Sequence, residues 1–383
     1  MQNKFARTSV GSLLIGHCAG MIDLISLPVW IGVLVGSLGY SPQVAGQTVT
    51  LFLLAVVVAS VVTARLFENL PRRPVAAVGF AVAGVCFFLA GMRSDIVALS
   101  LLHLLAGAGV GMGLSLVHGA MGRSDNPHRI FGFAGVALGG AGTVFLAIVP
   151  QVIQHTSGPI IFTIFSGIML VAALATLLAY PTLAPRVRTV EALRQAPLTA
   201  PVWFAIIGVS LMTLNNAVVF AFFDVIGKIR GFEPSAINTV FIVLGLLNFL
   251  VVAPAAVVLQ KRVRAERVVL VGPLFQLVLA IVITNAGSYL PWAAAAALYT
   301  GVQISTHTFA FGLLAKLDDS GRAVAATPAM LMLGAALGPL LGGAIGQVYG
   351  FGSLGFLALA IGAGAFGCFW RSVSGAQLRA LPV

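Results

Sequence analysis

Charged side chains are scarce in this sequence. Only 8% of its 383 residues are Asp, Glu, Lys or Arg, and 59% are hydrophobic, whereas an ordinary soluble domain has about 25% charged residues. A chain of this composition lacks the polar surface that it would need to face water on all sides. The scarcity of charge therefore excludes an ordinary soluble protein and indicates that the lipid bilayer is its solvent.

Cysteine and catalytic motifs are also lacking. Cys18, Cys86 and Cys368 stand singly in apolar stretches, so neither a disulfide framework nor a metal site is expected. The sequence contains no P-loop, no HExxH motif, no nucleophile elbow and no clustered pair of carboxylates. We therefore expect no enzyme, no metal and no cofactor, and any transport must be driven by ion or substrate gradients.

Long apolar runs fill the chain instead. Each is long enough to cross the hydrocarbon layer of roughly 30 Å as a helix. The fold class predicted is an all-α membrane protein of twelve transmembrane helices. The expected spans are 10–37, 43–66, 75–92, 96–120, 130–152, 158–180, 202–227, 235–259, 268–286, 290–315, 323–348 and 352–370.

The basic residues predict the orientation of these spans. If the N-terminus is cytoplasmic, all Lys and Arg residues except Arg93, Lys228 and Arg230 fall on the even-numbered loops and the two tails. Lys and Arg hold short loops on the cytoplasmic side, so we expect a multi-pass protein of the cytoplasmic (inner) membrane with both termini in the cytoplasm. Because the basic residues are spread over many short segments, a nucleic-acid partner is not expected.

The two halves of the sequence repeat related features. Asp23 of the first span corresponds to Asn216 of the seventh, and the basic turn at 68–73 corresponds to the one at 261–266. We expect two six-helix bundles, at 1–182 and 201–383, joined by a cytoplasmic linker at 183–200. Parallel repeats of this kind surround a central site that opens alternately to each side of the membrane.

Three stretches resemble motifs of the major facilitator superfamily. The turn Glu68–Arg73 resembles that family's acidic, Gly and double-Arg loop, with Pro71 in place of Gly. His103–Gly111 in the fourth span resembles its Arg and triple-Gly stretch, with His in place of Arg. Gly334–Gly343 in the eleventh span resembles its Gly-Pro-Gly-Gly signature. With the layout of the spans, the resemblance covers nearly the whole chain.

The resemblance implies a secondary transporter that alternates between inward-facing and outward-facing states. By the same resemblance, Glu68 would pair with a basic group, and Glu68, Arg72 and Arg73 would brace the cytoplasmic ends of the bundle. His103 replaces a residue that is always charged with one that titrates near neutrality. His103 and His118, on one stripe of the fourth span, are candidates for gating or coupling, and hydrogen-bonded packing is the alternative for each.

Two carboxylates, Asp23 and Asp224, are expected within the hydrocarbon layer. A charge there costs roughly 2.5–3.5 kcal/mol on insertion scales. Asp23 shares a helical face with Gly16, Gly20 and Trp30, and we expect it to take up and release the coupling proton. The alternative is a structural acid that is hydrogen-bonded to an asparagine of the seventh span.

Further polar residues inside the spans are candidates for substrate binding. Asp224 has Lys228 four residues on, which is typical of an ion pair, so a gate or a plain salt bridge is expected there. Amides and a buried histidine also serve as interhelical hydrogen bonds, so a packing role is the alternative for the others. The predicted substrate-binding residues are Trp30, Asn215, Asn216, Tyr299, Gln303 and His307.

The expected function is secondary active transport of a small molecule by alternating access. No Lys or Arg is expected at mid-membrane, which argues against a site built on a permanent cation. One acid among aromatic residues favours proton-coupled efflux of a lipophilic or cationic compound. A proton-coupled importer of a small nutrient and an uncoupled uniporter are the alternatives. The expected partners are the small-molecule substrate, protons and the lipid bilayer, and the chain is expected to be a monomer.

Overall fold

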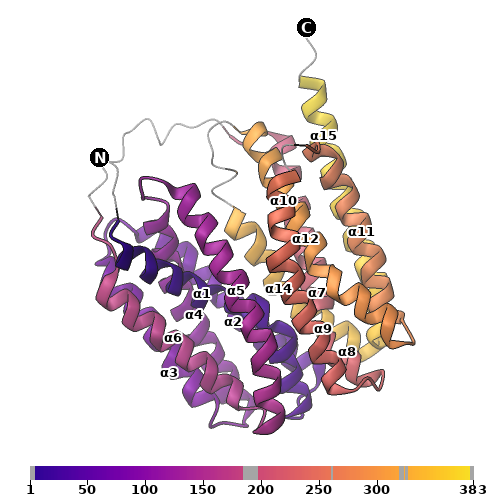
Figure 1. Ribbon diagram of the computed structural model, residues 1–383, viewed down its shortest axis with the longest axis horizontal. Coiled ribbons are helices and arrows are strands. Elements are labelled where there is room, and N and C mark those ends of the chain that lie inside the picture. The colour runs from indigo at the N-terminus through magenta and orange to yellow at the C-terminus, as the bar shows by residue number, and fades with distance from the viewer. Residues whose placement is uncertain (1–4, 184–196, 260–261, 319–322, 324–326, 380–383) are drawn as a thin grey trace. The chain divides into compact units, whose positions relative to one another are not determined.

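The apolar runs of the sequence form long helices in the computed structural model of the chain (Figure 1). The structure describes residues 5–183, 197–259, 262–318, 323 and 327–379, and these ranges contain no β-strand. The chain folds into two compact units. Unit 1 comprises Met1–Gly39 and Thr48–Arg194, and unit 2 comprises Tyr40–Gln47 and Gln195–Val383.

Unit 1 holds the helices of the first half of the chain, except for the first six residues of α2, 42–47, which belong to unit 2. In it α3 packs against α4 and α6, and α1 packs against α4, α5 and α6. The carboxylate of Asp95 caps α4 by accepting a hydrogen bond from the Ala98 N–H (2.8 Å), and Asn126 caps α5 in the same way through Arg129, which satisfies amides that a helix leaves unpaired. The helices are α1 (Arg7–Gly36), α2 (Pro42–Leu66), α3 (Arg72–Ala90), α4 (Ile96–Met121), α5 (Pro127–His155) and α6 (Ile160–Ala179).

Unit 2 holds the remaining helices, two of which are interrupted. A break at Ala221 and Phe222 separates α7 from α8, and a π-helical turn, η2, separates α9 from α10. Within the unit, α7 packs against α12, α14 and α15, and α11 packs against α12 and α15. The elements are α7 (Ala200–Phe220), α8 (Phe223–Ile229), α9 (Pro234–Leu247), η2 (Asn248–Val252), α10 (Ala253–Leu259), α11 (Ala265–Asn285), α12 (Tyr289–Leu317), α14 (Thr327–Tyr349), η3 (Phe351–Ser353) and α15 (Leu354–Arg379).

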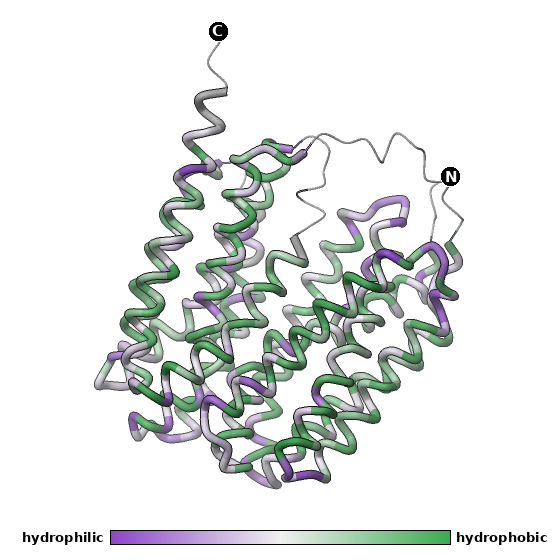
Figure 2. The backbone as a smooth tube through the Cα atoms, turned by 180° about the vertical axis from the view of Figure 1, so that it is seen from behind, coloured by the Kyte–Doolittle hydropathy of each residue, from purple (hydrophilic) through white to green (hydrophobic). Residues whose placement is uncertain are grey.

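Eleven helical segments among the described residues are long and apolar enough to cross a membrane. Hydrophobic residues run along the helices, and hydrophilic ones gather mainly in the connections (Figure 2). The expected tenth span, 290–315, is present as the 29-residue helix α12. It is not one of the eleven, because polar residues such as Gln303, Thr306 and His307 lower its hydropathy. The chain is thus an all-α, multi-pass membrane protein.

The interior of each unit is apolar and closely packed. In unit 2, Val209 and Met212 of α7 are fully buried against Phe309 and Leu313 of α12 and Phe369 of α15. In unit 1 the core is rich in aromatic rings. The expected linker at 183–200 falls largely on residues 184–196, which lie outside the described residues.

Candidate functional site

Asp23 lies near the middle of α1 and is 3% exposed. Its Oδ1 accepts a hydrogen bond from the backbone N–H of Leu24 (2.9 Å). Its Oδ2 is buried and has no hydrogen-bond partner in the described part of the chain. An ionised carboxylate is costly in such a place unless it is paired. The arrangement therefore suits a group that binds a proton or a cation and releases it again.

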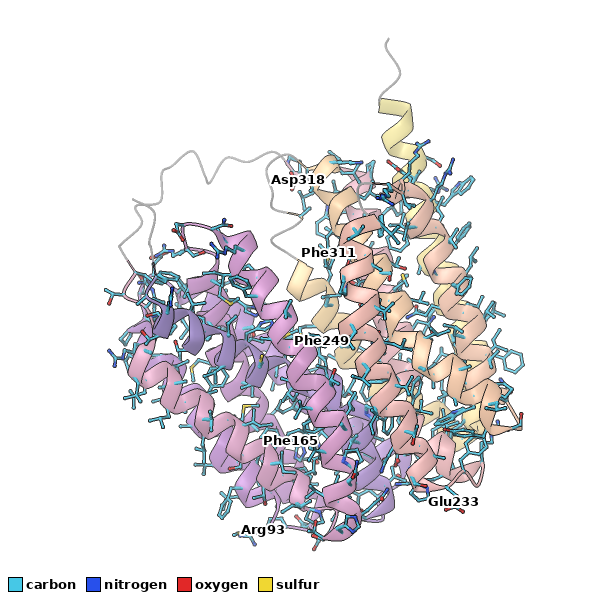
Figure 3. The ribbon with its side chains drawn as sticks, in the orientation of Figure 1. Arg93, Phe165, Glu233, Phe249, Phe311 and Asp318 are labelled. Carbon is cyan, nitrogen blue, oxygen red and sulfur yellow. The ribbon has the colours of Figure 1, made fainter. Side chains whose placement is uncertain are left out.

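Trp30 and His103 form the centre of an aromatic cluster in unit 1. Both side chains are fully buried, and their rings are stacked with centroids 5.3 Å apart. The rings of Phe52 and Phe165 meet Trp30 edge-on at 5.1 and 5.2 Å, and Phe165 is labelled in Figure 3. Trp30 lies two helical turns beyond Asp23 on the same face of α1, so one face of this helix carries both the acid and the aromatic anchor.

Some polar atoms of Trp30 and His103 have no hydrogen-bond partner among the described residues. His103 Nδ1 lies 2.7 Å from the Leu99 carbonyl oxygen, which makes Nδ1 the donor and leaves Nε2 as an acceptor. Neither His103 Nε2 nor Trp30 Nε1 has a hydrogen-bond partner among the described residues. The cluster thus contains one unused donor and one unused acceptor within an apolar shell.

His118 pairs with a residue to which the sequence analysis gave no role. His17 Nδ1 on α1 lies 2.9 Å from His118 Nε2 on α4, and the ring centroids are 5.1 Å apart. One ring donates and the other accepts, so the pair shares one proton between two helices. His17 is six residues from Asp23 and faces another side of α1, so the pattern around Asp23 could not find it.

Two neighbouring asparagines of α7, in unit 2, have side-chain atoms that lack a hydrogen-bond partner among the described residues. The side chain of Asn215 is fully buried, and neither its Oδ1 nor its Nδ2 has a partner in the described residues. The Oδ1 of Asn216 is also unpartnered. The hydroxyl of Tyr299 on α12 donates to the backbone carbonyl of Asn215 (2.9 Å). The structure therefore brings Asn215 and Tyr299 together and leaves three amide atoms of α7 without a partner among the described residues.

Gln303 and His307 of α12 face neighbouring helices rather than lipid. Gln276 Nε2 on α11 donates to Gln303 Oε1 (2.9 Å), and Thr213 Oγ1 on α7 lies 3.4 Å from His307 Nε2. Gln276 Oε1 is buried without a partner in the described structure. Gln276 and Thr213 were not predicted from the sequence, although a glutamine inside the apolar run 268–286 is a signal of a buried polar contact.

A further polar pair lies where the π-helical turn meets α12. Asn248 Nδ2 donates to Thr300 Oγ1 (2.6 Å), and Asn248 Oδ1 is buried without a partner in this part of the structure. Single π-helical turns inside α-helices occur frequently at functional sites. Asn248 thus joins the polar groups that line the inside of unit 2, and sequence reasoning missed it.

Charged groups lie at the ends of the helices. Asp224 in α8 is 2.7 Å from Lys228 one turn later. Glu68 forms ion pairs with Arg72 (2.8 Å) and Arg123, and Arg73 donates to the carbonyl groups of Leu177 and Leu178 at the end of α6.

These ion pairs tie together the ends of helices in unit 1. The guanidinium groups of Arg72 and Arg123 both lie over the ring of Phe67. Nearby, the Tyr180 hydroxyl donates to the Leu116 carbonyl (2.7 Å). Burial raises the pKa of that hydroxyl, while Arg72 and Arg123 act in the opposite direction. The turn after α2 thus connects α2, α3, α4 and α6.

The family of the chain follows from a comparison of sequences. Residues 13–316, well over half of the chain, match the family model described as the Major Facilitator Superfamily. The chain belongs to the major facilitator superfamily. Members of this superfamily are transporters of small molecules, so this member is a transporter and not an enzyme, and the resemblance seen in its motifs is confirmed.

Solved structures share the fold of this superfamily member. Two crystal structures of the nucleoside transporter NupG cover 96% of this chain, which in turn covers 99% of each of them. The structure of a point mutant has a TM-score of 0.71 and 11% identity, and the other has 0.70 and 13%. At these identities the likeness shows the fold alone. No protein of curated function matches the sequence.

The predicted site residues of this transporter fall into two sets. Asp23, Trp30, His103 and His118 lie in unit 1, and the residues of α7 and α12 lie in unit 2. Two apolar grooves, one in each unit, are lined by other residues. The polar side chains inside the helices, rather than these grooves, therefore make up the candidate site.

Proposed function

We propose that this superfamily member is a proton-coupled secondary transporter in which Asp23 carries the proton. The observation behind the proposal is the buried Asp23 Oδ2, which has no partner among the described residues. Protonation neutralises the side chain and eases its burial when the site closes, whereas the bare carboxylate disfavours that state. A proton and a substrate are thereby linked through one conformational equilibrium.

The proposed topology has twelve transmembrane helices, with α12 as the tenth. Its 29 residues correspond to about 44 Å of helix, which exceeds the hydrocarbon thickness of about 30 Å. In this proposal residues 1–182 and 201–383 form two six-helix bundles joined by a cytoplasmic linker at 183–200. The distribution of Lys and Arg supports a topology with both termini in the cytoplasm, and the protein of this proposal is a monomer in the cytoplasmic (inner) membrane.

The first proposed activity is export of a lipophilic or cationic compound. Asp23 supplies a negative charge, and the aromatic cluster around Trp30 supplies apolar and cation-binding surface. Of the residues assigned to substrate binding, Trp30 lies in unit 1 and the others lie in unit 2. The set comprises Trp30, Asn215, Asn216, Tyr299, Gln303 and His307, and Asp224, Glu68, Arg72, Arg73, His103 and His118 are assigned to gating or coupling.

A second candidate activity is uptake of a neutral, polar nutrient such as a nucleoside. The observation that favours it is the set of amide atoms in unit 2 that have no partner among the described residues, namely both polar atoms of Asn215, Oδ1 of Asn216 and Oε1 of Gln276. Amides both donate and accept hydrogen bonds, as a nucleobase requires. The fold that the chain shares with NupG, a nucleoside transporter, supports including nucleosides among the compounds tested.

The deciding experiment measures proton movement in proteoliposomes with a trapped pH-sensitive dye. Nucleosides, organic cations and lipophilic compounds are added in turn to wild type, Asp23→Asn and the matched control Asp95→Asn. Asp95 caps α4 from an exposed position, and asparagine caps helices equally well. We expect one class of compound to move protons with the wild type and the control but not with Asp23→Asn.

Exchange of labelled compound across the same membranes separates coupling from binding. Exchange needs no net proton movement, so it should survive Asp23→Asn if Asp23 carries only the proton. Net flux that is independent of pH and unchanged in Asp23→Asn would mean an uncoupled uniporter with a structural acid. Asn215→Val should weaken binding of a nucleoside, since buried groups that recognise it are lost, and should weaken binding of a lipophilic cation less, because such a compound makes fewer hydrogen bonds to an amide.

A further inference from the structure

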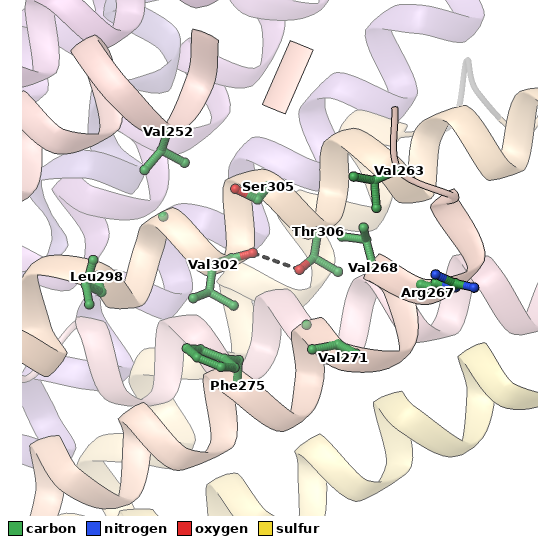
Figure 4. Close-up of a pocket in the computed structure, with 12 residues that line it drawn as sticks. Val252, Val263, Arg267, Val268, Val271, Phe275, Leu298, Val302, Ser305 and Thr306 are labelled. Atoms are coloured by element: carbon green, nitrogen blue, oxygen red, sulfur yellow. Dashed lines mark hydrogen bonds between the residues drawn. The ribbon is translucent and has the colours of Figure 1, made fainter. Parts of the chain in front are cut away.

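A groove of about 470 Å³ lies between α11, α12 and the end of η2 in unit 2 (Figure 4). Its walls are apolar, with Val252, Val271, Phe275 and Val302 among the lining residues. The hydroxyl of Thr306, which also lines it, donates to the Val302 carbonyl (2.8 Å). We call it the α11–α12 groove. Its surface therefore offers an apolar chain favourable packing and few hydrogen bonds.

The α11–α12 groove is open along its side. Val271 is 54% exposed and Phe275 is 57% exposed. Both lie on α11, one of the helices apolar enough to cross a membrane, so the opening meets the hydrocarbon layer. From Arg267 to Phe275 the groove follows α11 for about 12 Å. An extended hydrocarbon chain can enter it from the bilayer along this length.

One end of the groove is cationic. Arg267 lies there (Figure 4), and no ion pair involves it among the described residues. Arg262 precedes it in the same turn and is exposed. Arg264 is 3.6 Å from Glu266, the acidic residue of this turn. Arg267 therefore leaves an uncompensated positive charge at this end of the groove, and Arg262 lies five residues before it in the chain.

We infer that the α11–α12 groove binds an anionic phospholipid, with an acyl chain between α11 and α12 and the phosphate at Arg267. Arginine binds phosphate through two parallel hydrogen bonds. Basic pockets between transmembrane helices on the cytoplasmic side bind anionic headgroups, and the proposed topology places Arg267 on that side. The inference concerns a surface outside the transport site and goes beyond the proposed function.

A second groove provides an internal comparison. It lies between α1, α5 and α6 in unit 1, has a volume of about 530 Å³, and is lined by residues such as Cys18, Ala141 and Ile168. None of its described lining residues is charged. A hydrocarbon chain there has no headgroup partner, so charge rather than volume should decide which lipid binds selectively.

The test measures lipid binding by native mass spectrometry. Purified protein is titrated with phosphatidylglycerol or phosphatidylcholine, and the dissociation constants are compared. Wild type should bind phosphatidylglycerol more tightly. Arg267→Gln should weaken that binding about fivefold, as expected for loss of one basic residue near the headgroup, without affecting phosphatidylcholine. Arg371→Gln, a matched change at an exposed arginine of α15, should have no effect.

A second pair of variants tests the apolar part of the groove. Val271→Trp fills it, and Val278→Trp places the same side chain two turns further along α11, at a position with 58% exposure. Val271→Trp should abolish tight phosphatidylglycerol binding, and Val278→Trp should not. Equal binding of the two lipids by wild type, or unchanged binding in both Arg267→Gln and Val271→Trp, overturns the proposal. So does a Val271→Trp variant that loses binding of a lipophilic transport compound but keeps the lipid.

Discussion

The polar residues inside the apolar helices include pairs that bond to each other across helices. His17 and His118 are such a pair, and the stability that each one contributes depends on the other. The two rings join α1 to α4 through one hydrogen bond of 2.9 Å. Replacing either histidine with alanine leaves a buried polar nitrogen unpaired. We therefore expect the two substitutions to be coupled, by about 0.6–1.7 kcal/mol, as for other hydrogen bonds between transmembrane helices.

The coupling is measured by a double-mutant cycle on His17→Ala, His118→Ala and the double variant, with unfolding followed in mixed micelles. The pair Thr143→Ala and Thr156→Ala is a suitable control, because each hydroxyl donates to a carbonyl group of α5 itself and the two residues are 13 positions apart in the chain. Strictly additive effects of the two histidine changes would contradict the pairing.

At the residue scale, the sequence identifies the unusual residues within the spans but not their hydrogen-bond partners. Asp23 stands out because an acid is rare at such depth, and Trp30 because it shares a helical face with Asp23; both are buried in the structure. Which group each one meets depends on the packing of helices that are distant in sequence. Gln276, for example, is paired with Gln303, but nothing in the spacing of either span shows it.

At the scale of helices, the length of an apolar run predicts well that a transmembrane helix is present. It predicts poorly whether that helix is continuous or interrupted. The expected span 10–37 is α1 (Arg7–Gly36), and 96–120 is α4 (Ile96–Met121). The π-helical turn at Asn248–Val252 was not predicted, because it changes the local hydrogen bonding without changing the hydropathy. Such breaks are determined by contacts with neighbouring helices.

Glycines in α4 allow another helix to approach closely. A Cβ atom on Gly107 would collide with the backbone carbonyl of Phe52 on α2, and one on Gly111 would collide with that of Val56. Gly107→Ala must therefore push the two helices apart, and we expect it to destabilise the protein by about 1–3 kcal/mol. Small residues at helix interfaces in membranes serve this purpose.

Gly135→Ala on α5 is the matched control for that substitution. A Cβ atom there has no heavy atom within 4 Å, and alanine favours a helix over glycine by about 0.5–1 kcal/mol. Thermal unfolding in detergent should thus give a lower transition temperature for Gly107→Ala and an unchanged or higher one for Gly135→Ala. If both variants unfold like the wild type, the α2–α4 contact is not as close as described.

At the scale of the whole molecule, the side of the membrane on which the C-terminus lies depends on whether α12 crosses the membrane. Eleven apolar spans would place the two termini on opposite sides, and twelve would place them on the same side. The polar residues of α12 bond to α7, α11 and η2, so they do not face lipid. Hydropathy averages over all faces of a helix and therefore underrates a span whose polar face is buried.

Cysteine labelling decides the number of spans. In a background where the three native cysteines are serine, Gly287→Cys lies before α12 and Lys316→Cys lies in its last turn; both positions are exposed. With twelve spans, a membrane-impermeant maleimide labels Gly287→Cys in intact cells and labels Lys316→Cys only after permeabilisation. Asp95→Cys and Asn69→Cys, in loops proposed to lie outside and inside, calibrate the two responses. Labelling of both α12 positions from the same side would show that α12 does not cross, and would place the C-terminus outside the cell.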